Sequence, residues 1–130
     1  MTSEKLLSKL LFVEDDEVFF NVLRPRLLRA GFFVIWAKDG EEGIKKAKVE
    51  TPDIVVLDIV MPKVNGFEMI KILKERPLTK GLKFIILSNY GETRLVYDEE
   101  FRSALGIEKY LIKSNHTPSE IVREIKEIVC

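Results

Sequence analysis

Five short apolar runs divide the sequence at fairly even intervals. They are Leu10–Val13, Phe32–Ala37, Ile54–Leu57, Phe84–Leu87 and Tyr110–Ile112. The first, third and fourth runs are apolar at every position instead of alternating with polar residues. Uninterrupted runs of about four to eight residues are typical of strands buried on both faces of a parallel sheet. The pattern therefore predicts five strands in a parallel sheet.

The segment after the first run has the spacing of an amphipathic helix. Gly31 is a typical C-terminal glycine for it, and its expected buried stripe is Val18, Val22, Leu23, Leu27 and Ala30. Pro25 lies inside this segment and lacks the amide that would bond to the carbonyl of Asn21. Because a proline inside a helix costs roughly 3 kcal/mol or more, we expect this helix to bend near Asn21 or to be broken into two pieces.

Helical spacing continues between the later runs. The second helix, within residues 41–49, is expected to bury Ile44, Ala47 and, less regularly spaced, Val49. A third helix is marked by Phe67, Met69, Ile70 and Leu73. A fourth, with a weaker pattern, is expected somewhere within residues 92–105.

The last helix has the clearest start signal in the chain. Thr117 suits the N-cap, Pro118 the first helical position, and Glu120 completes a capping box. Its expected apolar face is Ile121, Val122, Ile125, Ile128 and Val129. Strand and helix thus alternate five times, which predicts an α/β fold: a doubly wound, five-stranded parallel sheet with right-handed crossovers, flanked by five helices. Because no linker or repeat interrupts the pattern, residues 1–130 are expected to form a single domain.

Composition argues against several classes of protein. Lys and Arg number 21, as do Asp and Glu, so the formal net charge is zero, which argues against a nucleic-acid-binding surface. The one cysteine, Cys130, permits no internal disulfide, as is usual in a reducing compartment. The apolar runs are far too short to cross a bilayer, and the N-terminus has no signal-peptide pattern. We therefore expect a cytoplasmic protein with no nucleic-acid or membrane partner.

Polar side chains follow four of the five apolar runs. Because ligands bind beyond the carboxyl ends of the strands in open parallel sheets, these residues are candidates for a shared site. In chain order they are Glu14, Asp15, Asp16, Asp58, Ser88, Asn89 and Lys113. Taken singly, each is more often an ordinary loop residue, and residues 14–17 alone would serve as an acidic cap for the first helix. Their joint placement at four strand ends favours a functional site.

The chemistry of this set points to phosphoryl transfer. Clustered carboxylates raise one another's pKa unless a cation compensates, and Mg²⁺ suits such oxygen ligands while leaving positions for phosphate oxygens. Asp58 can act as the nucleophile. Lys113 can pair with a carboxylate and then with a phosphoryl oxygen, to which Ser88 can donate a hydrogen bond.

A more specific signal comes from four segments, taken in order along the chain. They are residues 11–17 (Leu-Phe-Val-Glu-Asp-Asp-Glu), residues 52–67, Ile85–Ser88 and Tyr110–Lys113. The motif Asp-x-x-Met-Pro-x-x-x-Gly, from Asp58 to Gly66, is the most distinctive. Together these segments resemble the receiver domain of two-component response regulators, in particular stand-alone chemotaxis regulators. The resemblance implies a flavodoxin-like sheet with strand order 2-1-3-4-5.

Site roles follow from the resemblance, residue by residue. Asp58 corresponds to the phosphoacceptor, Asp15 to a direct Mg²⁺ ligand and Glu14 to a ligand that acts mostly through water. Val60 corresponds to the residue whose backbone carbonyl binds the metal, and Ser88 to the switch hydroxyl. Lys113 corresponds to the invariant lysine, and Tyr110 to the rotating aromatic ring. Members of the family take phosphate from the phosphohistidine of a histidine kinase, catalyse their own dephosphorylation, and signal through the surface around the fourth helix, last strand and last helix.

Several positions depart from the family pattern. Ser114 replaces the proline that usually follows the lysine, so we expect a trans peptide bond and a loop of different shape. Asn89 replaces a small residue and is expected to narrow access to the phosphate. Ser88 and Lys113 are a few residues further apart than usual, with the extra residues expected within 90–100. Val60 and Tyr90 are bulky, and we expect them to hinder the water that removes the phosphoryl group.

Two other hypotheses compete with the receiver interpretation. A degenerate receiver would act as a phosphorylation-independent docking module, which the departures favour and the complete set of site residues disfavours. An aspartate-nucleophile phosphatase would need a second acid two residues after Asp58, where Val60 stands. Because the chain ends at Cys130, just after the last helix, we expect output through protein contacts, with an unknown target or a second copy of the chain. A fragment of a longer regulator would have the same sequence.

Overall fold

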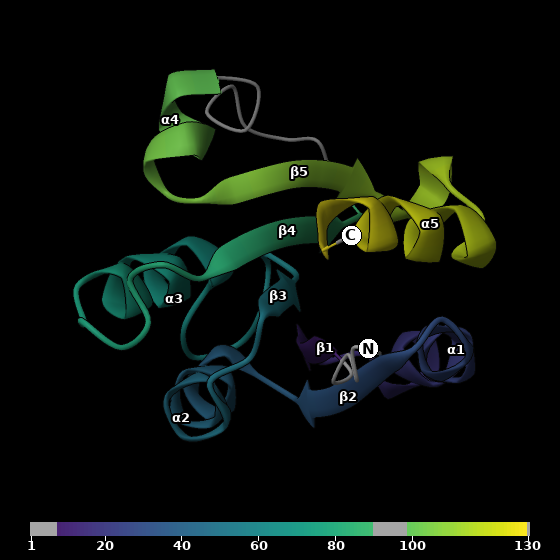
Figure 1. Cartoon of the computed structure of the whole chain (residues 1–130), viewed down its shortest axis with the longest axis horizontal. Coiled ribbons are helices and arrows are strands. Elements are labelled where there is room, and N and C mark those ends of the chain that lie inside the picture. The colour runs from purple at the N-terminus through teal and green to yellow at the C-terminus, as the bar shows by residue number, and fades with distance from the viewer. Residues whose placement is uncertain (1–7, 90–98, 130) are drawn as a thin grey trace, which may run out of the picture.

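The computed structural model describes residues 8–89 and 99–129. These residues contain one five-stranded parallel sheet with helices packed around it (Figure 1). The strands are β1 (Ser8–Val13), β2 (Phe32–Ala37), β3 (Ile54–Leu57), β4 (Lys83–Ser88) and β5 (Ile107–Ile112). Their order is β2-β1-β3-β4-β5 and every pair is parallel. The predicted fold class, strand number and strand order are therefore confirmed.

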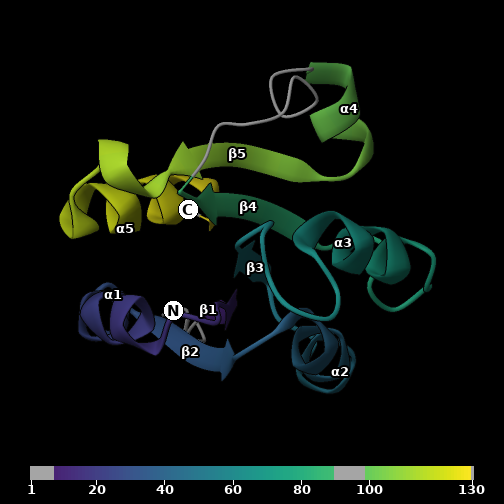
Figure 2. The same cartoon turned by 180° about the vertical axis from the view of Figure 1, so that it is seen from behind.

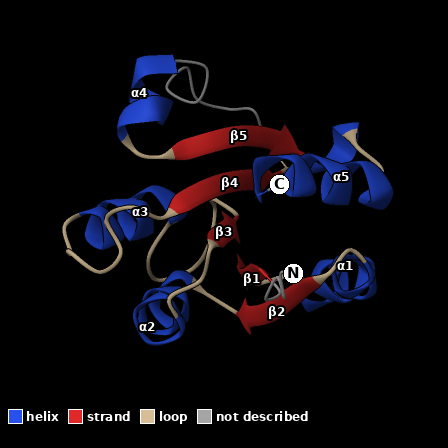
Figure 3. Cartoon of the chain, viewed as in Figure 1, coloured by secondary structure: helices blue, strands red, loops and turns tan. Residues whose placement is uncertain are grey.

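Helices cover both faces of the sheet, as the turned view also shows (Figures 1 and 2). They are α1 (Glu17–Arg29), α2 (Gly40–Glu50), α3 (Gly66–Lys74), α4 (Glu99–Ala104) and α5 (Pro118–Val129). Figure 3 shows α1 and α5 on one side of the strands and α2 and α3 on the other, with α4 beside β5. None of the described helices combines the length and the apolar character that spanning a membrane requires.

The core is split by the sheet into two apolar layers, because successive strand residues point to opposite faces. Phe12, Val56 and Leu87 face α1 and α5, whereas Val13, Leu57 and Ile86 face α2 and α3. All six are fully buried. The three central strands are thus buried on both faces, which is the physical reason for their uninterrupted apolar runs.

The buried face of α1 differs from the predicted stripe. Leu23 and Leu27 are buried as expected, but Val18 is 74% exposed and Val22 is 39% exposed. Phe20 is buried in their place. Phe20, Leu23 and Leu27 have the same helical spacing as the predicted set, and burying the larger aromatic ring removes more apolar surface from water.

Pro25 does not break α1, which is one helix from Glu17 to Arg29. The two-piece alternative is therefore wrong. Pro25 and Asn21 are both exposed, so water can bond to the Asn21 carbonyl that lacks an amide partner. Gly31 adopts φ of +98°, which confirms it as the left-handed residue after the helix.

The other helices largely follow their predicted patterns. In α2, Ala47 is buried, but Val49 is 79% exposed and its predicted burial is wrong. In α3 and α5 the predicted faces are buried or half-buried. Helix α4 lies within the range predicted for the fourth helix, whereas Tyr90 and most of the expected insertion lie outside the described residues.

A capping box begins α5, as predicted. The amide of Glu120 donates to Thr117 Oγ1 at 3.1 Å, and the amide of Thr117 donates to Glu120 Oε1 at 2.8 Å. Thr117→Ala is expected to lower the free energy of unfolding by about 1 kcal/mol, because it leaves a helix amide without its cap. Urea denaturation measures this change. Ser119→Ala, an exposed change on the same turn, should have little effect, and equal losses in the two variants would contradict the capping role.

Candidate functional site

The carboxyl ends of β1 and β3 bring two acids side by side. Val13 is paired with Leu57 in the parallel register, and the next residue along each strand is an acid. The amide of Glu14 donates to the Ala37 carbonyl at 2.9 Å, and the amide of Asp58 donates to the Val13 carbonyl at 3.3 Å. These backbone bonds continue the ladder by one residue and fix both acids at the sheet edge.

On the other side of β3, strands β4 and β5 supply the remaining polar groups. Ser88 is the last residue of β4 and pairs with Ile112, so Lys113 follows directly at the same edge. The resulting hollow of about 240 Å³ is lined by Glu14, Asp15, Asp16, Asp58, Val60, Ser88, Asn89 and Lys113. Thus the structure brings together the seven residues predicted from strand ends, with Val60 beside them.

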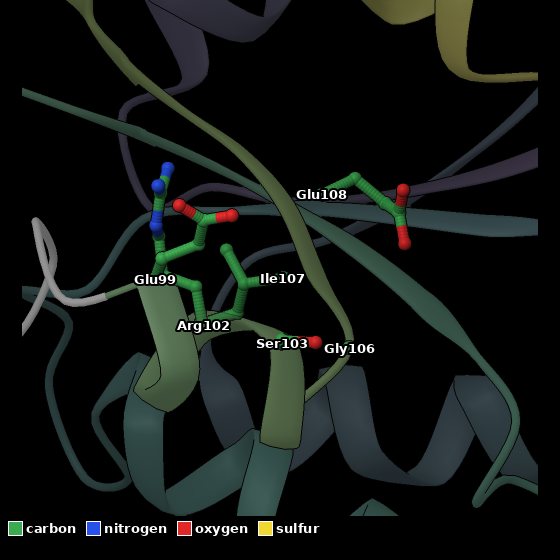
Figure 4. Close-up of a pocket in the computed structure, with 6 residues that line it drawn as sticks. All are labelled: Glu99, Arg102, Ser103, Gly106, Ile107 and Glu108. Carbon is green, nitrogen blue, oxygen red and sulfur yellow. The ribbon is translucent and has the colours of Figure 1, made fainter.

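Of the predicted site residues, Tyr110 alone does not line this hollow. It is half-buried and packs with the core layer on the side of α2 and α3. The larger hollow of about 410 Å³ lies elsewhere, between α4 and the start of β5, where Arg102, Ser103, Gly106 and Glu108 line it (Figure 4). Its two acids, Glu99 and Glu108, belong to no group of potential metal ligands among the described residues, so chemistry rather than size identifies the candidate site.

Lys113 connects the two strand-end acids. Its Nζ lies 2.8 Å from Glu14 Oε1 and 3.3 Å from Asp58 Oδ2, and it hydrogen-bonds to the latter. All three side chains are at most 8% exposed. Because little water reaches these charges, each depends strongly on the others.

Burial dominates the electrostatics of Glu14. It raises the pKa of Glu14 to about 7, and the neighbouring Lys113 ammonium, which favours the carboxylate, offsets only part of the effect. Burial by itself would lower the pKa of Lys113, but the charges of Glu14 and Asp58 outweigh it and raise that pKa above its ordinary value. Lys113 is therefore a firmly charged ammonium, whereas Glu14 exchanges its proton near neutral pH.

The acids fit a hard divalent cation. One carboxylate oxygen each from Glu14, Asp15 and Asp58 lies within 4.8 Å of the others. Oxygen-only donor sets suit Mg²⁺. The buried Glu14 Oε1 already lies 2.8 Å from the Lys113 ammonium, so the oxygen-only donor set of the three acids is what fits a cation here.

The backbone after β3 holds Asp58 in place. The amide of Val60 donates to Asp58 Oδ1 at 3.2 Å, and the amide of Gly66 donates to the Ile59 carbonyl at 2.9 Å. A Cβ atom at residue 66 would lie 2.5 Å from the Asp58 carbonyl oxygen, closer than real contacts allow. Glycine is therefore required where the start of α3 packs against the Asp58 backbone.

Two aromatic residues contact the site and were not predicted from the sequence. Trp36 Nε1 donates to the Glu14 carbonyl at 2.9 Å. The Phe19 ring centroid lies 4.4 Å from Lys113 Nζ. Both side chains look like ordinary core residues in the sequence, and no local pattern distinguishes them.

The loop after Lys113 contains Ser114 where the family usually has proline. Residues Lys113–Asn115 form a short 3-10 helix, and the described residues contain no cis peptide bond. The expected trans bond at Ser114 is confirmed.

Glu14→Gln is expected to remove a pH dependence of stability from the metal-free protein. Because the pKa of Glu14 is about 7 in the native state against 4.5 ordinarily, the native state holds this proton more tightly than the unfolded chain. The resulting stabilisation is complete below pH 4.5 and is lost as pH rises through 7. The free energy of unfolding of the wild type, minus that of the variant, should fall by about 2 to 3 kcal/mol between about pH 5 and pH 8.

Urea denaturation in EDTA at the two pH values measures this difference. Subtracting one free energy of unfolding from the other removes the contributions of titrating groups away from the site, because both proteins share those groups. A difference that does not change with pH would show that Glu14 keeps an ordinary pKa.

Comparison with known proteins identifies the family. The family model described as the response regulator receiver domain matches residues 10–126 of this chain. The chain belongs to this family. Receivers are signalling domains of two-component systems. The predicted resemblance to a response regulator receiver domain is thereby confirmed.

Two curated relatives cover nearly all of this chain. The alkaline phosphatase synthesis transcriptional regulatory protein PhoP of Bacillus subtilis is 38% identical over 125 residues, which are 93% of this chain and 48% of that protein. The phosphate regulon transcriptional regulatory protein PhoB of Rhizobium meliloti is 33% identical, over 95% of this chain and 53% of that protein. This receiver thus spans about half the length of these relatives.

Solved structures agree with the fold. A CheY-like response regulator receiver domain protein from Methanospirillum hungatei has a TM-score of 0.80 and 25% identity, over 95% of this chain and 94% of that one. Response regulator TrrA from Thermotoga maritima, crystallised with Mg²⁺-BeF, has a TM-score of 0.78 and 27% identity, over 94% and 99% of the two chains.

Proposed function

We propose that this receiver accepts a phosphoryl group on Asp58 from the phosphohistidine of a histidine kinase or phosphotransfer protein. The observation that carries the proposal is the buried contact of one ammonium, Lys113, with both Glu14 and Asp58, beside the exposed carboxylate of Asp15. This arrangement combines an acid nucleophile, a positive charge and a potential cation site in a single hollow.

Each residue has a defined part in the transfer. An Asp58 oxygen attacks phosphorus, the bond from phosphorus to the histidine nitrogen breaks with its electron pair going to nitrogen, and an acyl phosphate forms. Lys113 and Ser88 would stabilise the phosphoryl oxygens, the former by its charge and the latter by donating a hydrogen bond. Mg²⁺, held by Glu14, Asp15, Asp58 and the carbonyl of Val60, would neutralise negative charge there. The same site would later admit the water that removes the phosphoryl group.

Signalling would follow from a switch at Ser88 and Tyr110. Ser88 ends β4 at the site, and Tyr110 is half-buried on neighbouring β5. Movement of the Ser88 hydroxyl toward a phosphoryl oxygen would favour an inward Tyr110 ring. That change biases two states of the surface formed by α4, β5 and α5.

The proposed setting is a cytoplasmic receiver formed by residues 1–130. It would catalyse only its own phosphorylation and dephosphorylation, and it would signal to a protein target or a second copy of itself. Lys113 is already paired with the acceptor carboxylate, so the geometry favours this function over a phosphorylation-independent docking module.

Incubation with phosphoramidate tests the proposal. In Mg²⁺ the intact mass should increase by one phosphoryl group, and hydroxylamine should remove it as expected for an acyl phosphate. In EDTA the increase should be absent. No increase in Mg²⁺ across a range of donor concentrations would contradict the proposed function.

A further inference from the structure

The Lys113 ammonium has an aromatic neighbour as well as its two acids. Its Nζ stands over the Phe19 ring, 4.4 Å from the centroid. A cation within about 6 Å of a ring centroid is attracted by the negative face of the ring. Since the Lys113 side chain is only 8% exposed, little water competes for the ammonium, and this attraction is stronger than at the surface.

Other residues hold the Phe19 ring in its place. The Phe19 amide donates to Asp16 Oδ1 at 3.1 Å at the start of α1. Its ring meets buried Phe12 edge to face, with centroids 6.3 Å apart and planes at 83°. Phe12 meets Phe20 in the same way at 5.6 Å, and Phe20 stacks on Trp36 at 4.9 Å. The ring beneath the ammonium is thus part of a packed aromatic cluster.

A neutral ring has an advantage over a further acid in this position. Glu14 and Asp58 already supply two carboxylates to a single ammonium, and a third would add repulsion among them. The ring attracts the ammonium without adding net charge. Its attraction for the ammonium does not depend on whether Asp58 is a free carboxylate or an acyl phosphate.

We propose that Phe19 is a positioning residue that holds the Lys113 ammonium at Asp58 through its ring face. This inference rests on the proposed function. The competing explanation is that Phe19 only fills space in the core. The two differ in whether the electron density of the ring matters or only its volume.

Successive fluorination of the residue 19 ring separates these explanations. Fluorine withdraws electrons from the ring face while changing its size little, so each added fluorine should slow phosphorylation by phosphoramidate. Phe19→Leu should slow it by about three- to tenfold, and Phe19→Tyr should restore most of the rate. Mg²⁺ affinity should stay within about twofold, because a phenylalanine ring offers no oxygen ligand to the cation. That affinity is followed by the fluorescence of Trp36, the single tryptophan.

The matched control is Phe32→Leu. Phe32 is 3% exposed and packs in the same core layer, but it begins β2, at the opposite end of the sheet from the site. Its loss should lower stability without the graded change in rate. Rates that do not change with fluorination, or that rise, overturn the inference.

A readout in the unphosphorylated protein separates this inference from the proposed function. Because the end of the Lys113 side chain lies over the face of the Phe19 ring, the ring current should move the proton resonances of Lys113 upfield. Phe19→Leu should return these resonances to ordinary lysine values. If the wild type takes up no phosphoryl group, the proposed function fails, and these shifts alone decide whether Phe19 holds Lys113. Ordinary Lys113 shifts in the wild type overturn the inference.

Discussion

Asp58→Asn is expected to abolish the phosphoryl adduct entirely. Asparagine has nearly the same shape, and its side-chain oxygen can still accept the Val60 amide that Asp58 Oδ1 accepts at 3.2 Å. It has no carboxylate to attack phosphorus, however, so the covalent step is lost while the fold is kept. Intact mass after incubation with phosphoramidate and Mg²⁺ measures the result.

Asp53→Asn is the matched control for this loss. Asp53 directly precedes β3, at the end away from the site, and its Oδ2 accepts the Lys9 amide at 2.7 Å. The control should take up one phosphoryl group like the wild type. An undiminished adduct on the Asp58 variant would place the acceptor at another residue.

Lys113→Met should slow phosphorylation by about 100-fold or more, since it removes a preorganised charge from the developing negative charge of the transition state. Methionine keeps most of the length and apolar volume of the lysine stem. Its loss of charge also leaves Glu14 and Asp58 without their shared ammonium, so the pKa of Glu14 should rise further. The initial rate of adduct formation at saturating Mg²⁺ measures the catalytic effect.

Lys109→Met provides the comparison, because Lys109 lies on β5, the strand that leads directly to Lys113. Lys109 also contacts two acids, Glu124 and Glu127 of α5, but away from the hollow. Its replacement should change the rate by less than about twofold, because neither Lys109 nor its two partner acids line the hollow that holds Asp58. Equal slowing in both variants would mean that the charge of Lys113 has no special part in the transfer.

The placement of the site was predictable because it depends on topology. In a parallel sheet all carboxyl ends meet at one edge, so Glu14, Asp58, Ser88 and Lys113 could be grouped before any distance was known. The start of α5 was predictable for a similar reason. Its capping box lies within four consecutive residues, from Thr117 to Glu120, and needs no distant partner.

The predictions that were wrong concern choices between faces. Val18 and Val22 fit an apolar stripe by spacing, and Val49 fits one less regularly, yet the structure exposes all three. Helical spacing alone allows two neighbouring sets of apolar residues on the same helix to be the buried face. Which set is buried depends on the surface of the sheet against which the helix packs. The proline in α1 was similarly ambiguous, because its cost depends on whether water can reach the Asn21 carbonyl.

The α/β fold, the edge at which the polar groups gather and the identity of the acids and the lysine could all be predicted from the amino-acid sequence, because they follow from local periodicity and from strand order. The position of Phe19 beneath the Lys113 ammonium and the hydrogen bond from Trp36 to the Glu14 carbonyl became visible only in the folded chain. Such contacts join residues 94 and 22 positions apart, and their geometry is fixed by the packing of α1 and β2 around the end of β1.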